Sequence, residues 1–219
     1  MPLAELTGVL ERLSAERGGV LGVPPGLLVE PDDGWTPVTE LLREPYELLG
    51  GLVEQTAARW DAPRHVGAAL LWKSYGYWHT VPMALGWALG RRVPIMRLAD
   101  TYVKVSGTGL TIGATAVSVA SDAAAIRAAL LDGQAPLVAA ISSLARVGQR
   151  TLWGSTAEAF AHPLRHFVQA DYMELLAAVG APVDGLIERT ADGHRRKTCC
   201  LWVTLPDVQP CATCCVRCR

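Results

Sequence analysis

The residues with the clearest chemical potential are cysteines near the end of the chain, and no cysteine precedes them. They are Cys199, Cys200, Cys211, Cys214, Cys215 and Cys218. Thiolates are soft ligands for zinc and for iron–sulfur clusters. In a reducing compartment, clustered cysteines are metal ligands or redox groups more often than structural disulfides. A disulfide could not join this stretch to the rest of the chain, so the sequence predicts a metal site here.

The spacing of the first four cysteines bears on which metal they suit. Cys211 and Cys214 form a Cys-x-x-Cys turn, which brings two thiolates to one metal ion. Cys199 and Cys200 are adjacent, and adjacent side chains of an extended chain point to opposite faces. Such a pair chelates a single ion poorly unless the backbone bends, whereas a binuclear cluster offers two irons and a wider ligand perimeter. The pattern favours a [2Fe–2S] cluster and leaves zinc open.

The last two cysteines create a second Cys-x-x-Cys, from Cys215 to Cys218. Either of them could exchange with a ligand or serve as the fourth one. The alternative is that both are spectator thiols at the end of the chain. We favour spectators, because the first four cysteines already complete a site.

The stretch RRKTCCLWVTLPDVQPCATC resembles the C-terminal signature of the FhuF-like ferric-siderophore reductases. Their pattern is Cys-Cys, ten residues, Cys, two residues, Cys, with basic residues just ahead. The segment TLWGSTAEAFAHPLRHF also resembles a Leu-Trp-Gly helical segment of that family, while the N-terminal third matches no motif. The resemblance implies that Cys199, Cys200, Cys211 and Cys214 hold a [2Fe–2S] cluster.

The activity that the resemblance implies is reduction of siderophore-bound Fe(III) to Fe(II), which releases iron in the cytosol. Hard oxygen donors, such as those of a hydroxamate siderophore, hold Fe(III) tightly and Fe(II) weakly, and a [2Fe–2S] centre supplies one electron. No G-x-G-x-x-G lies between a strand and a helix, so the electron would come from a ferredoxin or a reductase protein. The alternatives are a zinc-stabilised interaction or regulatory module, and an iron–sulfur electron-transfer or sensor protein.

Basic residues precede the first cysteine, at Arg195, Arg196 and Lys197. Positive charge near an anionic four-thiolate cluster raises its reduction potential, and it would also attract an anionic substrate or donor. The competing interpretation is an ordinary solvated linker, because most charge runs lie at the surface. We weigh the two interpretations evenly.

Aromatic residues gather around a lysine in the stretch LWKSYGYWHT. Trp72, Lys73 and Tyr75 from this stretch, with Trp153 from the Leu-Trp-Gly segment, are candidates for a siderophore pocket. Aromatic side chains at helical spacing more often pack into a core, and we favour that interpretation.

Composition limits the remaining possibilities. Half of the residues are hydrophobic and the net charge is −1, which gives no basic field for nucleic acid. The most apolar stretches, VPMALGWALG and LTIGATAVSVA, are short of the roughly 18–20 residues that cross a bilayer. The first residues carry acids and no long apolar run, so no secretory signal is expected. We therefore expect a cytoplasmic protein without a transmembrane segment, and peripheral docking on a membrane stays open.

The elements expected around the site make a mostly helical α+β body at residues 1–190, followed by a cysteine-rich segment at residues 191–219. Hydrophobic spacing predicts helices over 3–17 and 63–90, the second with a break or kink at Pro82. Short antiparallel strands are expected over 93–98, 101–107 and 109–119. The body thus divides into an N-terminal helical part at about 1–62, a sheet at about 93–119, and helices that begin after Ser121, at Pro136 and around the Leu-Trp-Gly segment. The stretch from 182 to 197 is expected to be a linker.

Overall fold

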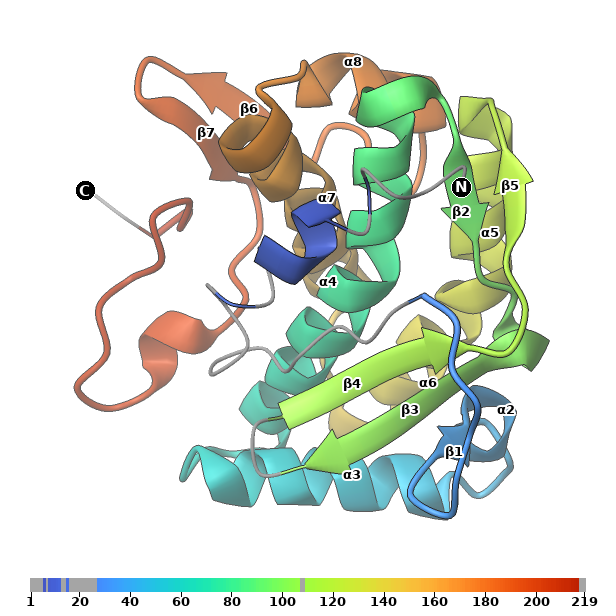
Figure 1. Cartoon of the computed structure of the whole chain (residues 1–219). Coiled ribbons are helices and arrows are strands. Elements are labelled where there is room, and N and C mark those ends of the chain that lie inside the picture. Colours follow the sequence, from blue (N-terminus) through green and yellow to red (C-terminus); the bar gives the residue numbers. More distant parts are fainter. Residues whose placement is uncertain (1–5, 7, 13–14, 16–26, 107–108, 217–219) are drawn as a thin grey trace.

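The computed structural model of the chain describes residues 6, 8–12, 15, 27–106 and 109–216. Most of this part is helical, with short antiparallel sheets, so the predicted α+β class is confirmed (Figure 1). Residues 6, 8–12 and 15 are helical, and the rest of the first predicted helix lies outside the described residues. The helices are α2 (Val38–Leu41), α3 (Glu47–Arg59), α4 (Arg64–Gly90), α5 (Ala123–Gly133), α6 (Ala135–Ala145), α7 (Gln149–Pro163) and α8 (Tyr172–Val179), with short turns η1 (Leu98–Asp100), η2 (Leu164–Val168) and η3 (Trp202–Thr204).

The centre of the fold is α4, which packs against α3 and α7. Pro63 occupies its N-cap position, where a proline costs no helical hydrogen bond, so the helix begins one residue later than the predicted range 63–90. Pro82 lies inside the helix without ending it, so the predicted break is wrong. Most residues of α4 are buried, which explains why its sequence is apolar on nearly every face rather than along one stripe.

The strands form separate small sheets rather than one. They are β1 (Thr36–Pro37), β2 (Val93–Ile95), β3 (Thr101–Ser106), β4 (Gly109–Ala114), β5 (Ser118–Ala120), β6 (Ile187–Thr190) and β7 (Gly193–Arg196). The antiparallel pairing expected between the strands over 101–107 and 109–119 is confirmed for β3 and β4, where Ser106 faces Gly109. The third predicted strand is split into β4 and β5, and β5 pairs with β2 instead of joining β3 and β4.

The expected linker before the cysteines is wrong, because β6 and β7 form an antiparallel hairpin there. The proposed boundary between residues 190 and 191 falls inside this hairpin. The hairpin is attached to the body by the Tyr172 hydroxyl, which donates a hydrogen bond of 3.1 Å to the Gly193 carbonyl. The cysteine-rich segment follows β7 and runs along one side of the molecule (Figure 1).

By length and composition, Ala123–Ala145 is apolar enough to cross a membrane, with mean hydropathy 1.3, and half of that window is buried in the protein. Buried core helices of soluble proteins also meet this criterion of length and hydropathy. The helical run is interrupted at Gln134, which is fully buried and bonded to His79, Thr80 and Thr156. The longest apolar window therefore lies in α5 and α6, not in the two stretches that the sequence singled out.

Candidate metal and ligand site

The cysteine-rich segment is fastened to the body by its own apolar cluster. Leu205 packs with Val66 and Leu70 of α4, and Leu201, Trp202 and Val208 border this cluster. The contact places the segment beside the N-terminal half of α4. The cysteines therefore lie against the folded body.

Gly154 on α7 allows the cysteine-rich segment to approach the body closely at a second point. A Cβ at this position would overlap the side chain of Thr198, the residue just ahead of the first cysteine. The Leu-Trp-Gly segment thus has a structural reason for its glycine: any larger residue would push the start of the cysteine-rich segment away from α7.

Arg196 is the side chain around which the thiols meet. It comes from β7, is 2% exposed, and its Nη2 donates to the Sγ atoms of Cys200 and Cys211 over 2.9 and 3.0 Å. Burial opposes its charge, yet the pKa of Arg196 is raised, because Cys200, Glu158 and Cys211 stabilise the cation. A buried cation needs such anionic partners, and two of the three here are thiols.

The thiols influence one another's ionisation. A hydrogen bond from Cys211, together with the positive charges of Arg196 and Lys73, lowers the pKa of Cys200 to about 4 despite burial. The same hydrogen bond and burial raise the pKa of Cys211. Burial chiefly raises the pKa of Cys199, and its electrostatic interaction with Cys200 adds to the increase. Cys199, Cys200 and Cys211 are therefore linked electrostatically, and Cys200 is the thiol among them whose pKa is lowered.

Backbone groups also reach the sulfurs. The N–H of Leu201 donates to Cys199 Sγ over 3.3 Å and the N–H of Val216 donates to Cys214 Sγ over 3.4 Å. The Cys211-to-Cys214 turn is closed by a hydrogen bond of 3.0 Å from the Cys214 N–H to the Cys211 carbonyl. Hydrogen bonds to sulfur are a main means by which proteins tune thiolate-bound metal centres.

The predicted ligands differ in exposure. Cys200 and Cys214 are buried, Cys199, Cys211 and Cys215 are half-buried, and Cys218 lies outside the described residues. Within the described ranges, no three His, Cys, Asp or Glu side chains converge closely enough to hold one metal ion. The thiols are instead arranged in contacts such as that of Cys200 with Cys211.

The basic residues separate into different roles. Arg195 forms an ion pair of 2.6 Å with Glu188 across the hairpin, at the surface, and Lys197 is exposed. Arg196 is buried against the sulfurs, because alternate residues of a strand face opposite sides. The solvated-linker interpretation is thus wrong for Arg196.

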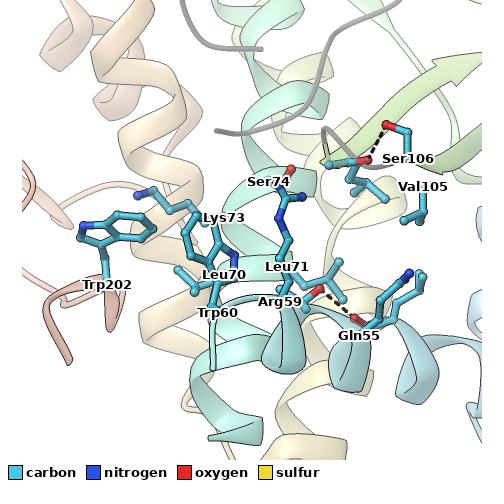
Figure 2. Close-up of a pocket in the computed structure, with 14 residues that line it drawn as sticks. Gln55, Arg59, Trp60, Leu70, Leu71, Lys73, Ser74, Val105, Ser106 and Trp202 are labelled. Carbon is cyan, nitrogen blue, oxygen red and sulfur yellow. Dashed lines mark hydrogen bonds between the residues drawn. The ribbon is translucent and has the colours of Figure 1, made fainter. Parts of the chain in front are cut away.

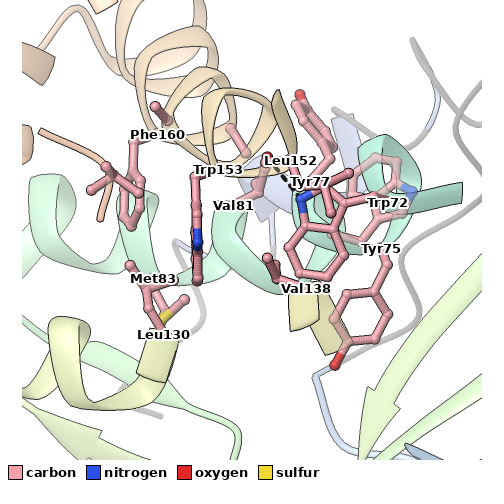
Figure 3. Close-up of a cluster of buried hydrophobic side chains, with 14 of the residues drawn as sticks. Trp72, Tyr75, Tyr77, Val81, Met83, Leu130, Val138, Leu152, Trp153 and Phe160 are labelled. Atoms are coloured by element: carbon pink, nitrogen blue, oxygen red, sulfur yellow. Dashed lines mark hydrogen bonds between the residues drawn. The ribbon is translucent and has the colours of Figure 1, made fainter. Parts of the chain in front are cut away.

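Three of the four candidate pocket residues lie in the hydrophobic core (Figure 3). Trp72 is fully buried and donates to the Leu152 carbonyl over 2.8 Å, Tyr75 is stacked on it, and Trp153 packs edge-on against it. Their assignment to a siderophore pocket is therefore corrected to packing in the core, in agreement with the interpretation favoured from their spacing. Of the four predicted pocket residues, Lys73 remains a candidate.

Lys73 lines a pocket of about 330 Å³ beside the cysteine-rich segment (Figure 2). Its Nζ lies 5.1 Å from the ring centroid of Trp202, whose ring in turn packs edge-on against Trp60 at 5.1 Å. Arg59 at the end of α3 lies 5.6 Å from the centroid of Trp60 and also lines the pocket. Other lining residues come from α3, α4 and the β3–β4 hairpin: Leu52, Gln55, Thr56, Leu70, Leu71, Ser74, Val105, Ser106, Gly109 and Leu110.

Sequence reasoning missed Arg59, Trp60 and Trp202 as pocket residues. Trp202 could have been suspected, because it stands two positions after Cys200. Nothing in the sequence signals that the end of α3 lies next to it, since this depends on the packing of α3 on α4.

Comparison with family models and with curated proteins gives no relative from which to assign the chain. No protein-family model matches it, and no curated protein is significantly similar to it in sequence.

Proposed function

We propose that this protein is an iron–sulfur reductase that transfers one electron to Fe(III) held by a siderophore, and so releases the iron as Fe(II). The observation that carries the proposal is that one residue, Lys73, interacts with the thiols and also lines the pocket. Lys73 acts on the charge of Cys200 and Cys211 and contacts Trp202, which lines the pocket. A ligand in this pocket would therefore contact Lys73 and Trp202, the residues that connect the pocket with the cysteine-rich segment.

The donor set suits a [2Fe–2S] cluster. Such a cluster takes four thiolates, two for each iron, and Cys199, Cys200, Cys211 and Cys214 are the proposed ligands. Two buried donors close to them, Arg196 Nε and Thr198 Oγ1, have no hydrogen-bond partner among the described residues. Buried donors need acceptors, and inorganic sulfide and thiolate are acceptors. A bound cluster would supply a one-electron carrier at this place.

The chain's own residues have separate tasks in this proposal. Arg196 stabilises negative charge on the thiols, and the apolar contacts of Leu205 keep the cysteine-rich segment on α4. Lys73 and Trp202 contact each other and line the pocket that the chelate would occupy. No acid or base is needed at the iron, because loss of affinity follows from reduction itself. The electron would come from a ferredoxin-like or reductase partner in the cytoplasm.

The test is a metal and sulfide assay of anaerobically purified protein, with visible absorption and EPR spectra of the same sample. We expect equal iron and acid-labile sulfide, a red-brown colour, and an EPR signal that appears on one-electron reduction. Stoichiometric zinc in colourless protein would refute the proposal and favour a zinc-stabilised interaction module instead.

A further inference from the structure

The charged side chains that line the pocket beside the cysteine-rich segment are all cations among the described residues. Arg59 and Lys73 line it, and no Asp or Glu is among the described residues that do so. In the described part of the chain neither cation forms an ion pair, and each instead lies near a tryptophan ring. Cations without carboxylate partners at a concave site attract an anionic ligand.

The other walls of the pocket suit a ligand that is partly organic. Trp60 and Trp202 give flat apolar surfaces, while Gln55 and Ser106 add polar side chains (Figure 2). A cavity of about 150 Å³ holds a benzene ring, so a pocket of about 330 Å³ holds part of a chelate, not the whole. Arg59 and Gln55 are exposed, so the remainder of the ligand would extend into solvent between them.

We infer that this pocket selects ferric chelates by their charge, and that Arg59 and Lys73 make it prefer a chelate with a free carboxylate. The inference rests on the proposed function for the identity of the ligand. Three hydroxamates neutralise Fe(III), so the charge of a trihydroxamate complex is set by its pendant groups. A carboxylate pendant would pair with the two cations, and an ammonium pendant would be repelled by them.

The experiment uses one linear trihydroxamate in three forms, with its terminal amine free, acetylated or succinylated. The complexes then carry a positive, zero or negative charge around the same metal coordination. Loading them with Ga(III), which is not reduced, separates binding from electron transfer. Calorimetric titrations of the full-length protein, prepared anaerobically, give the three dissociation constants.

We expect the succinylated complex to bind at least about tenfold more tightly than the free amine, with the acetylated complex between them. The double variant Arg59→Gln, Lys73→Gln should bind all three alike. The single variant Arg59→Gln, at an exposed position, should lose part of the preference even if the double variant folds poorly. Arg127→Gln, which removes an exposed arginine of α5 outside the pocket, should keep the wild-type order.

Equal affinity for the three complexes, tighter binding of the free amine, or no binding at all would overturn the inference. So would an unchanged order in the double variant. These results can be told apart from a failure of the proposed function, which would show as zinc or missing sulfide in the same preparation. A charge preference in protein without a cluster would keep the binding site and reject the reductase.

Discussion

The substitution Arg196→Gln tests the link between the hairpin and the thiols. Arg196 Nη2 lies 2.9 and 3.0 Å from two sulfurs, in a position that is 2% exposed. If its charge centre lies roughly 6 Å from an added electron, an effective dielectric constant of about 20 gives an interaction of about 3 kcal/mol. At 1.36 kcal/mol for each 59 mV, removal of this charge lowers the one-electron midpoint potential by about 130 mV.

The measurement is a potentiometric titration followed by EPR, with iron and sulfide assayed in each variant. Arg195→Gln is the matched control, because Arg195 is nearly half exposed and pairs with Glu188 at the surface. Solvent and salt screen its charge, so its removal should shift the potential by less than about 20 mV. Arg196→Lys, which keeps the charge, should recover much of the wild-type value. Equal shifts in the Arg195→Gln and Arg196→Gln variants, or no shift in either, would refute the reasoning.

The other predictions concern stability and ligand choice. Gly154→Ala should lower the free energy of unfolding by about 1–3 kcal/mol and reduce iron content, because its methyl group overlaps the start of the cysteine-rich segment. Gly148→Ala, where a Cβ meets nothing within 4 Å, is its control in thermal melts, and equal losses would refute the overlap. Burial lowers the pKa of His79 to about 4, so its contribution to stability is present above its ordinary pKa and is lost as the pH falls towards 4. Between pH 7 and 5, wild-type protein should lose about 2 kcal/mol more than His79→Asn in denaturant titrations, and parallel losses would contradict this. The variant Cys214→Ser should lose iron and sulfide, while Cys215→Ser should keep both. The reverse result would make Cys215 the ligand and Cys214 the spectator thiol.

Much of the fold could be predicted from local signals. The 27 residues of α4 follow from a long apolar run after Pro63, and the β3–β4 hairpin follows from β-branched residues around a glycine-bearing turn. The hairpin of β6 and β7 was missed because charged residues dominate its sequence. Its register depends on cross-strand pairs such as Arg195 with Glu188, which a search for hydrophobic alternation does not detect.

The candidate site was predictable only in part. The cysteines are recognisable as candidate metal ligands from their residue type and spacing. The basic residues just ahead of them indicate cationic partners for the thiolates. Alternate residues of β7 face opposite sides of the strand, so Arg196 points inward to the sulfurs and Arg195 points outward. The sequence alone does not show which of the two basic residues contacts sulfur. The pocket joins Arg59, Lys73 and Trp202 from three separate segments, so it exists only once α3, α4 and the cysteine-rich segment have packed together.

The measurement that tests the central claim most directly is a single turnover under anaerobic conditions. Chemically reduced protein, freed of excess reductant, is mixed with a ferric trihydroxamate in the presence of an Fe(II)-specific dye. The account predicts that the protein is reoxidised as the dye captures one Fe(II) for each electron that the protein held. Reduced protein that keeps its electron in the presence of the chelate, or protein that contains no reducible centre, would contradict it.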